Sequence, residues 1–392
     1  MQSMEDFKKC IHTGFCGGCK YGNLPYEEQC QIKEKEVLEN LEKNEITPNT
    51  YGGFEPCPLQ HRYGYRNKME YTFGDFVKDG PLCLGMHRQK SFMSIVTVDR
   101  CIIADPDFNE ILKYTLGFAE DRGYKNYHKK RHDGLLRNLV VRKGARTGEL
   151  LVNIVTSSEP GFDEEAYVDG LMNLALKGTI VGILRTFNDA LADAVICDEL
   201  KILYGRDYYM DEIAGLKFRV SAFSFFQTNV DAAERLYLEA IDLIDDFQDK
   251  SVFDLYCGTG TISQILARKA NRVTGVELVE DAVLSARENA KLNGLDNCHF
   301  IAGDVFEVLK EVEEKPDVIV VDPPRMGMTP KAVDKIASYD VDQILYISCN
   351  PKTLAPNLKQ LEFFGYRVEY LKAYDNFPGT KHTECVALLC KA

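Results

Sequence analysis

The sequence has no run of apolar residues as long as the roughly 18 that a membrane-spanning helix needs. Its first nine residues are polar and charged, so they do not resemble a secretory signal. It also has no internal repeat, no low-complexity segment and no sign of an obligate protein partner. These absences argue against membrane, secreted and repeat proteins. We therefore expect a cytoplasmic globular protein of two or three domains.

Positive charge is in deficit too, with 47 Lys and Arg against 60 Asp and Glu and a net charge of −13. An acidic total argues weakly against a nucleic-acid partner. However, residues 51–150 carry 17 basic and 12 acidic side chains, with basic clusters at 125–132 and 137–146. Binding to nucleic acid requires a local positive surface rather than a basic total. Charge alone leaves RNA binding and an ordinary solvated loop equally acceptable.

Three regions differ in their patterning. Residues 1–50 contain a cysteine-rich loop and a predicted helix at 26–43, in which Val37 and Leu41 are among the apolar residues at helical spacing. Residues 51–217 alternate short apolar segments with turns, which predicts a mainly antiparallel α+β domain. Its clearest predicted strands are 68–73, 139–142, 150–155 and 179–184.

Residues 218–392 alternate strands with helices. The strand segments contain few polar residues, as expected for strands covered on both faces. This region is therefore predicted to be a Rossmann-like, doubly wound α/β domain with seven strands. The predicted strands are 251–256, 272–276, 298–302, 317–321, 343–348, 367–373 and 385–390.

The turn after the first of these strands contains Gly258 and Gly260, which let the backbone approach a ligand closely. Glu277 ends the second strand, where a carboxylate can accept hydrogen bonds from both ribose hydroxyls. Asp304 follows the third strand, within reach of an adenine amine. A dinucleotide-binding oxidoreductase would share the turn, but the third glycine of its fingerprint is missing. The combination favours S-adenosylmethionine.

The fifth strand ends at Cys349, just before a helix predicted to begin near Pro351. Ligands of this fold lie beyond the carboxyl ends of the strands, and the helix dipole is expected to lower the pKa of the thiol. Addition of a thiolate to carbon 6 of uracil makes carbon 5 nucleophilic enough to take a methyl group. A base must then remove the carbon-5 proton. Glu384, at the start of the seventh strand, is the candidate.

Each of these two residues has a simpler interpretation when taken alone. A cysteine at a strand end is more often an inert buried thiol, and a loop glutamate is more often a solvated carboxylate. Their occurrence together, at the rim of one cofactor-binding fold, favours catalysis by Cys349 and Glu384.

Across nearly its whole length the sequence resembles the (uracil-5-)-methyltransferases of transfer and ribosomal RNA. The matching motifs are Phe225-Phe226-Gln227-Thr228-Asn229, residues 254–258, Asp322-Pro323-Pro324-Arg325, Ser348-Cys349-Asn350 and residues 375–384. The resemblance implies that Cys349 is the nucleophile, that Glu384 is the base, and that S-adenosylmethionine contacts Gln227, Tyr256, Glu277 and Asp322. Gly379, where a larger residue is usual, and Thr383, where an apolar one is usual, depart from the last motif.

Cys10, Cys16 and Cys19 have the spacing of a metal or cluster site, and Cys101 is the candidate for the fourth ligand. The spacing alone suits either zinc or a [4Fe–4S] cluster. The resemblance implies a [4Fe–4S] cluster, as in ribosomal RNA members of the family, and hence favours 23S rRNA over tRNA as substrate. The small β-barrel that precedes the cysteines in many relatives is expected to be absent, since the chain starts nine residues before Cys10.

Residues that contact RNA are harder to assign. Phe225, Phe226 and Phe377 are as well suited to the core as to stacking on an unpaired base. Contacts to phosphates are expected from three central residues, Arg66, Lys68 and Arg137.

Other functions remain as alternatives. An RNA cytosine-5 methyltransferase more often has a cysteine after Pro-Pro, and an adenine methyltransferase needs an aromatic residue there, whereas this chain has Arg325. A non-catalytic RNA-binding module would not need Cys349 or Glu384. An iron–sulfur electron carrier would leave the cofactor fold without a purpose.

Overall fold

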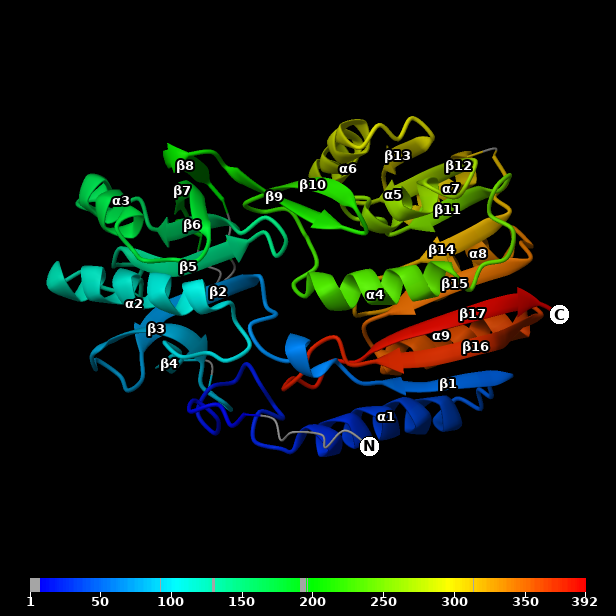
Figure 1. The fold of residues 1–392 in the computed structure, drawn as a ribbon, viewed down its shortest axis with the longest axis horizontal. Coiled ribbons are helices and arrows are strands. Elements are labelled where there is room, and N and C mark those ends of the chain that lie inside the picture. The colour runs from blue at the N-terminus through cyan, green and yellow to red at the C-terminus, as the bar shows by residue number, and fades with distance from the viewer. Residues whose placement is uncertain (1–7, 92, 129–130, 191–194, 196, 313) are drawn as a thin grey trace.

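The structure is a computed structural model that describes residues 8–91, 93–128, 131–190, 195, 197–312 and 314–392. Residues 129 and 130 of the predicted basic cluster lie outside this part of the chain. Two large sheets lie beside each other, with the hairpin β9–β10 between them and the N-terminal helix α1 along the edge of the C-terminal sheet (Figure 1).

The C-terminal sheet has eight strands among the described residues. Five neighbouring strands, from β15 to β13, pair in parallel, β17 runs antiparallel between β15 and β16, and β1 pairs in parallel with β16 at the edge of the sheet. All seven predicted strands of residues 218–392 are confirmed, with each end within one residue. In spatial order the strands are β1 (Thr50–Glu55), β16 (Tyr366–Tyr374), β17 (Glu384–Lys391), β15 (Gln343–Ser348), β14 (Val318–Val321), β11 (Ser251–Leu255), β12 (Arg272–Glu277) and β13 (Cys298–Ala302).

Alternate side chains of this sheet enter two different cores, because successive residues of a strand point to opposite faces. Val318 and Val320 of β14 pack with the layer that includes α4 and α5, whereas Ile319 and Val321 pack with α8 and α9. The strands are therefore covered on both faces, as their apolar sequences predict. The helices of this region are α4 (Val230–Ile241), α5 (Thr261–Ala267), α6 (Glu280–Leu292), α7 (Val305–Glu311), α8 (Pro330–Ala337) and α9 (Pro351–Phe363).

Helix α1 (Tyr26–Lys43) has the bounds that the apolar spacing predicts. Its buried Val37 and Leu41 join the core that contains Leu354 and Leu358 of α9. Strand β1, which follows, pairs with β16. The two elements on either side of residue 50 thus both pack on the C-terminal sheet, at its β16 edge.

The second sheet has the order β4-β3-β2-β5-β6-β7-β8 and is antiparallel except for the parallel pair β6–β7. Helices α2 (Pro106–Asp121) and α3 (Glu164–Met172) pack into its apolar core. The predicted strands of this region are confirmed, with extended bounds. The strands are β2 (Lys68–Asp75), β3 (Leu82–His87), β4 (Ile95–Thr97), β5 (Leu136–Lys143), β6 (Glu149–Thr156), β7 (Thr179–Phe187) and β8 (Glu199–Gly205). A short 3-10 helix, η1 (Leu59–His61), precedes β2.

The hairpin of β9 (Tyr208–Ile213) and β10 (Leu216–Ser221) joins the two sheets. Its turn residues Ala214 and Gly215 have left-handed φ values of +51° and +73°. Ile213 and Phe218 are fully buried in one core with residues of α4 and of the C-terminal sheet. The boundary between the central and C-terminal regions, expected between residues 217 and 218, therefore falls inside β10.

Candidate active site

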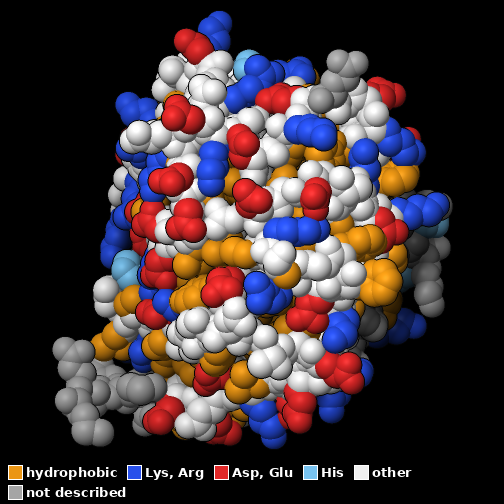
Figure 2. All heavy atoms as spheres, turned by 90° about the vertical axis from the view of Figure 1, so that its right-hand side faces the viewer, with side chains coloured by type: hydrophobic (Ala, Val, Ile, Leu, Met, Phe, Trp, Pro, Cys, Tyr) orange, Lys and Arg blue, Asp and Glu red, His pale blue; other side chains and the backbone are white. Residues whose placement is uncertain are grey.

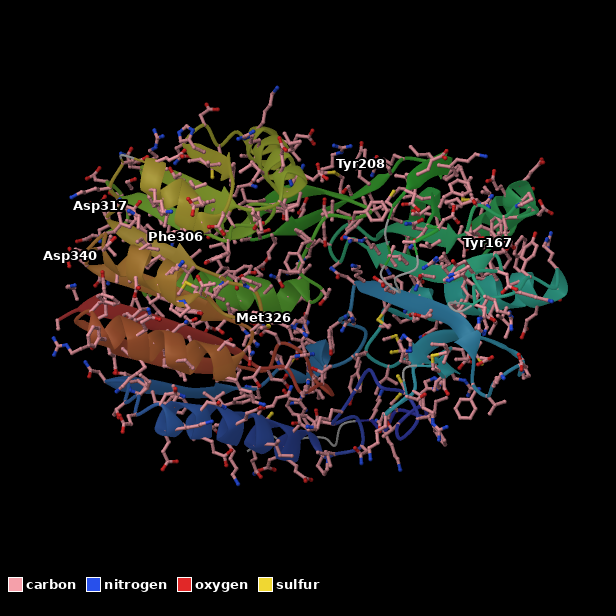
Figure 3. All side chains as sticks on the ribbon, turned by 180° about the vertical axis from the view of Figure 1, so that it is seen from behind. Tyr167, Tyr208, Phe306, Asp317, Met326 and Asp340 are labelled. Carbon is pink, nitrogen blue, oxygen red and sulfur yellow. The ribbon has the colours of Figure 1, made fainter. Side chains whose placement is uncertain are left out.

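The carboxyl ends of the parallel strands point toward the second sheet. Met326, which follows β14, lies toward the middle of the molecule, whereas Asp317 and Asp340, which precede β14 and β15, lie at its outer end (Figure 3). On that outer end acidic and basic side chains are interspersed (Figure 2). The candidate residues follow the carboxyl ends, so they face the space between the two sheets.

The turn after β11 has the backbone of a ligand-binding loop. Gly258 and Gly260 have left-handed φ values of +54° and +77°, and a Cβ on Gly260 would lie 2.8 Å from the ring of Phe300. Tyr256 also has a left-handed φ of +67°, which is rare for a residue with a Cβ. Backbone strain of this kind is often found at functional sites.

Glu277 is held against this turn. Its Oε2 accepts a hydrogen bond from the N–H of Gly258 at 3.0 Å, and its Oε1 accepts one from the N–H of Val279 at 2.9 Å. A carboxylate oxygen can accept more than one hydrogen bond. Glu277 can therefore bind two hydroxyl groups of a ligand from a fixed position.

Asp304 follows β13 and has a structural role that its sequence position did not reveal. Its Oδ1 accepts a hydrogen bond from the N–H of Glu307 at 3.2 Å, which caps the N-terminus of α7. Burial, together with the carboxylate of Asp304, raises the pKa of Tyr256 to about 12. Asp304 therefore lies near Tyr256.

Gln227 is brought to the same site through Tyr237 of α4, because its Nε2 donates a hydrogen bond to the Tyr237 hydroxyl. Burial is the main cause of the raised pKa of Tyr237. The nearby carboxyl groups of Asp322 and Glu384 raise this pKa further. Asp322, which follows β14, has a raised pKa because of burial and of the nearby carboxyl groups of Glu384 and Asp254. Such a group of carboxyls favours a cationic ligand.

Cys349 and Glu384 lie near each other at one rim of the sheet. The antiparallel register of β15 and β17 pairs Ser348 with Cys385, and Cys349 and Glu384 are the residues next to that pair. The carboxyl group of Glu384 is close enough to Cys349 to raise the pKa of its thiol. The structure thus brings together the two residues that the sequence predicts to be catalytic.

The pKa of Cys349 differs from the sequence expectation. Helix α9 does begin at Pro351, with Asn350 as its N-cap. However, burial and the carboxyl groups of Glu384 and Asp322 raise the pKa of Cys349 to about 11. The prediction of a thiolate favoured by the helix dipole alone is therefore wrong, because desolvation and two carboxyls outweigh it. Burial likewise raises the pKa of Glu384 to about 7.

Arg325 is a site residue whose role sequence reasoning missed. Its guanidinium lowers the pKa values of both Cys349 and Glu384, opposing the effect of burial. Its backbone oxygen accepts hydrogen bonds from Asn350 Nδ2 at 2.9 Å and Thr353 Oγ1 at 3.3 Å. Arg325 therefore supplies positive charge beside the candidate nucleophile from a loop tied to the same strand end.

The three phenylalanines considered for stacking on a base differ in their burial and packing. Phe226 is buried and packs against Phe218, with ring centroids 5.5 Å apart. Phe377 packs against Tyr65. Phe225 is 66% exposed and its backbone oxygen accepts a hydrogen bond from Thr259 of the glycine turn. Only Phe225 among these three is placed to stack on a base.

The three basic residues that were expected to contact phosphates also differ in their surroundings. Arg137 is buried and donates to the backbone oxygens of Asn188 and Ala190, so its guanidinium is directed to the protein rather than to a phosphate. Arg66 lines a cavity beside the N-terminal cysteines. Lys68 is half-buried, and burial lowers its pKa.

The cysteines Cys10, Cys16, Cys19 and Cys101 all line that one cavity, whose volume is about 130 Å³. The Cys16 sulfur accepts a hydrogen bond from the N–H of Gly18 at 3.4 Å. Within the described residues, no three His, Cys, Asp or Glu side chains are grouped closely enough to hold one metal ion. The structure thus brings the four predicted thiols to one cavity.

The chain is similar to known proteins in both sequence and fold. The family model of the tRNA (Uracil-5-)-methyltransferases matches residues 195–392. An RNA methyltransferase of Clostridium tetani is 50% identical over 96% of this chain and 82% of that protein. An RNA methyltransferase of Caldanaerobacter subterraneus subsp. tengcongensis is 49% identical over 98% of this chain and 84% of that protein. The solved structure of the Pyrococcus abyssi tRNA (uracil-54, C5)-methyltransferase with S-adenosyl-L-homocysteine has a TM-score of 0.78 and 26% identity, over 97% of this chain and 86% of that one.

The chain belongs to the tRNA (uracil-5-)-methyltransferase family. It is therefore an RNA methyltransferase that uses S-adenosylmethionine. Membership of this enzyme family argues against the alternative that the chain is an iron–sulfur electron carrier. In the described part of the chain, no helix is both long and apolar enough to cross a membrane.

The structure explains one of the two departures from the last family motif. Gly379 has a left-handed φ of +83°, a conformation that glycine adopts without strain. Its N–H donates to Gln29 Oε1 at 2.8 Å and its backbone oxygen accepts from the N–H of Tyr21 at 2.8 Å. Thr383 is buried, and its hydroxyl has no hydrogen-bond partner among the residues described. Nothing in the structure explains that hydroxyl.

Proposed function

We propose that this RNA methyltransferase transfers a methyl group to carbon 5 of a uridine through a covalent adduct between Cys349 and carbon 6 of the base. The observation that carries the proposal is the proximity of Cys349 and Glu384, which stand next to the Ser348–Cys385 pair of β15 and β17, at the strand ends where the cofactor turn also lies. A nucleophile and a base on one face, beside a methyl donor, are what this chemistry requires.

The first step needs the thiolate of Cys349. A pKa of about 11 keeps the thiol protonated near neutral pH, so a positive charge must enter the site. The sulfonium of S-adenosylmethionine, placed near Asp322, would supply that charge and complement Arg325. We infer that binding of the methyl donor prepares the nucleophile, which couples the two substrates.

The thiolate forms a bond to carbon 6, and the electron pair of the carbon 5–carbon 6 double bond moves toward carbon 5 and the adjacent carbonyl. Carbon 5 then takes the methyl group, and S-adenosylhomocysteine leaves. Glu384 accepts the carbon-5 proton, the double bond re-forms, and the sulfur–carbon bond breaks to release the thiolate. A carboxyl with a pKa of about 7 can accept and return this proton near neutral pH.

The proposed contacts to S-adenosylmethionine are residues that lie at the strand ends. Glu277 would accept hydrogen bonds from the ribose hydroxyls. The turn at Gly258 lets the donor approach the backbone. The other proposed contacts are Gln227, Tyr256, Asp304 and Asp322, which lie around the same turn and strand ends.

The substrate is proposed to be 23S rRNA, held by the central region (residues 51–217) and the rim of the catalytic region (residues 218–392). Phe225 would stack on an unstacked base. The test is to map 5-methyluridine in the RNA of a strain that lacks the gene. Loss of the modification at a 23S rRNA position, restored by the wild-type gene but not by Cys349→Ala, is expected. Loss in tRNA instead would overturn the ribosomal assignment and leave the chemistry intact.

Cys10, Cys16, Cys19 and Cys101 are proposed to hold a [4Fe–4S] cluster. Their four thiols line one cavity, and four thiolates are the ligand set of such a cluster. The methylation steps require no electron transfer. The cluster would join residues 1–50 to the loop that contains Cys101.

Metal content tests this assignment. Protein purified without oxygen is expected to be brown and to contain about four irons per chain. Cys16→Ser should reduce the iron content strongly, because it removes one of the four thiolates, whereas Cys83→Ser, which leaves all four in place, should not. Metal analysis and the visible spectrum provide the readout, and a colourless protein with one zinc ion would contradict the proposal.

A further inference from the structure

Residues 375–383 form the loop between β16 and β17, which ends at Glu384. Side chains and backbone from distant parts of the chain bind its backbone oxygens. Asn229 Nδ2 donates to the oxygen of Asn376 at 2.6 Å, and the hydroxyl of Tyr65 donates to the oxygen of Pro378 at 2.9 Å. The conformation of this loop is thus set from outside it.

A buried ion pair fixes the start of the loop. Lys33 of α1 and Asp375 are both fully buried, with Lys33 Nζ 2.6 Å from Asp375 Oδ1. The same Nζ donates to the backbone oxygen of Phe377 at 3.1 Å. The hydroxyl of Tyr26 donates to Asp375 Oδ2 at 2.8 Å. Lys33 therefore contacts the loop at two points.

One turn away on α1, the fully buried Gln29 contacts the middle of the loop. Its Oε1 accepts the N–H of Gly379, as described above, and its Nε2 donates to the backbone oxygen of Leu24 at 2.9 Å. Gln29 and Lys33 are four residues apart, so they lie on one face of the helix. That face is directed to the loop that carries Glu384.

Stability alone is a poor explanation for this arrangement. Desolvation makes a buried ion pair weak evidence for stability, and an apolar pair of similar size is often as stable. Such a pair does fix one geometry, since a charge buried without its partner is strongly unfavourable. At the end of this loop, small displacements of Glu384 relative to Cys349 would be costly for proton transfer.

We propose that Lys33 and Gln29 are positioning residues of the methylation reaction, which hold the loop so that Glu384 faces Cys349 in the step that releases the methylated RNA. This inference rests on the proposed role of Glu384. It assigns the N-terminal helix a part in catalysis, separate from any cluster held by the neighbouring cysteines.

The experiment compares Lys33→Met and Gln29→Met with Lys35→Met, an exposed position on the same helix. Enzyme, S-adenosylmethionine and RNA transcripts that contain the mapped uridine are mixed, and three quantities are measured. These are the kcat, the KM for each substrate, and the fraction of protein shifted to a covalent RNA adduct on a denaturing gel. Glu384→Gln is measured in parallel. Gln29→Met leaves the charges in place, so it decides the question alone if Lys33→Met does not fold.

We expect kcat to fall about 10- to 100-fold in Lys33→Met and Gln29→Met, with little change in KM and with accumulation of the adduct. Lys35→Met should resemble the wild type. A loss of activity without adduct, in proportion to the loss of folded protein, would overturn the positioning role. Adduct in Glu384→Gln but not in the helix variants would also overturn it. Absence of adduct in every variant, Glu384→Gln included, would instead reject the assignment of Glu384.

Discussion

Cys349→Ala is expected to lower the rate of methyl transfer by about 10⁴-fold or more, while S-adenosylmethionine still binds. Without the sulfur, carbon 5 of the uracil has no route to sufficient nucleophilicity, so no alternative residue restores the reaction. The cofactor turn and Glu277 are separate from Cys349, which directly follows β15. Methyl incorporation into RNA and binding of S-adenosylmethionine, measured by calorimetry, check the two halves of this prediction.

Cys298→Ala is the matched control, because Cys298 is another half-buried thiol of the same sheet that lies at the start of β13. It should retain activity near that of the wild type. Turnover in Cys349→Ala at more than a few per cent of the wild-type rate would contradict the covalent route. Loss of binding of S-adenosylmethionine would show that the substitution damages the fold rather than the chemistry.

Glu384→Gln is expected to trap the methylated intermediate. The amide cannot accept the carbon-5 proton, so the sulfur–carbon bond persists and turnover falls by about 10²- to 10⁴-fold. The first methyl transfer precedes this step and should still occur. A denaturing gel with RNA carrying a labelled methyl group is the measurement, and a slower-migrating labelled protein band is the expected result.

Glu369→Gln is the control for this prediction, since Glu369 is an exposed carboxylate of the adjacent strand β16. It should give neither adduct nor loss of turnover. Release of product by Glu384→Gln at the wild-type rate would mean that another group takes the proton, and Asp322 would then be the next candidate because it lies close to Glu384.

Periodicity located the elements of the C-terminal sheet well. Apolar runs such as Gln343–Ser348 are long and continuous, so the strands were predictable to within a residue. Strand β1 was not, because Thr50–Glu55 contains two glycines and is partly exposed, and its pairing with β16 depends on the tertiary fold. The hairpin β9–β10 was missed for a similar reason, since it is buried only after the two sheets have come together.

At the site, residues next to strand ends were predictable and their interactions were not. Cys349 and Glu384 stand at the ends of recognisable strands, but their proximity depends on the register of β15 and β17. The pKa of Cys349 was predicted in the wrong direction, because the sequence reveals the following helix but not the burial or the two nearby carboxyls. Lys33 could not be predicted, since its partner Asp375 is distant in sequence and nothing local marks a buried lysine.

The pairing of β1 with β16 has a consequence for biosynthesis. Strand β1 leaves the ribosome long before its partner β16 is made, and the Asn49–Glu369 hydrogen bond beside this pairing spans 320 residues. Until β16 and β17 are synthesised, β1 has no partner strand at this edge, and Lys33 lacks its ion-pair partner Asp375. A nascent chain that already contains Cys349 therefore still lacks Glu384 and the strand that positions it. The proposed nucleophile meets its proposed base only after β17 has been synthesised.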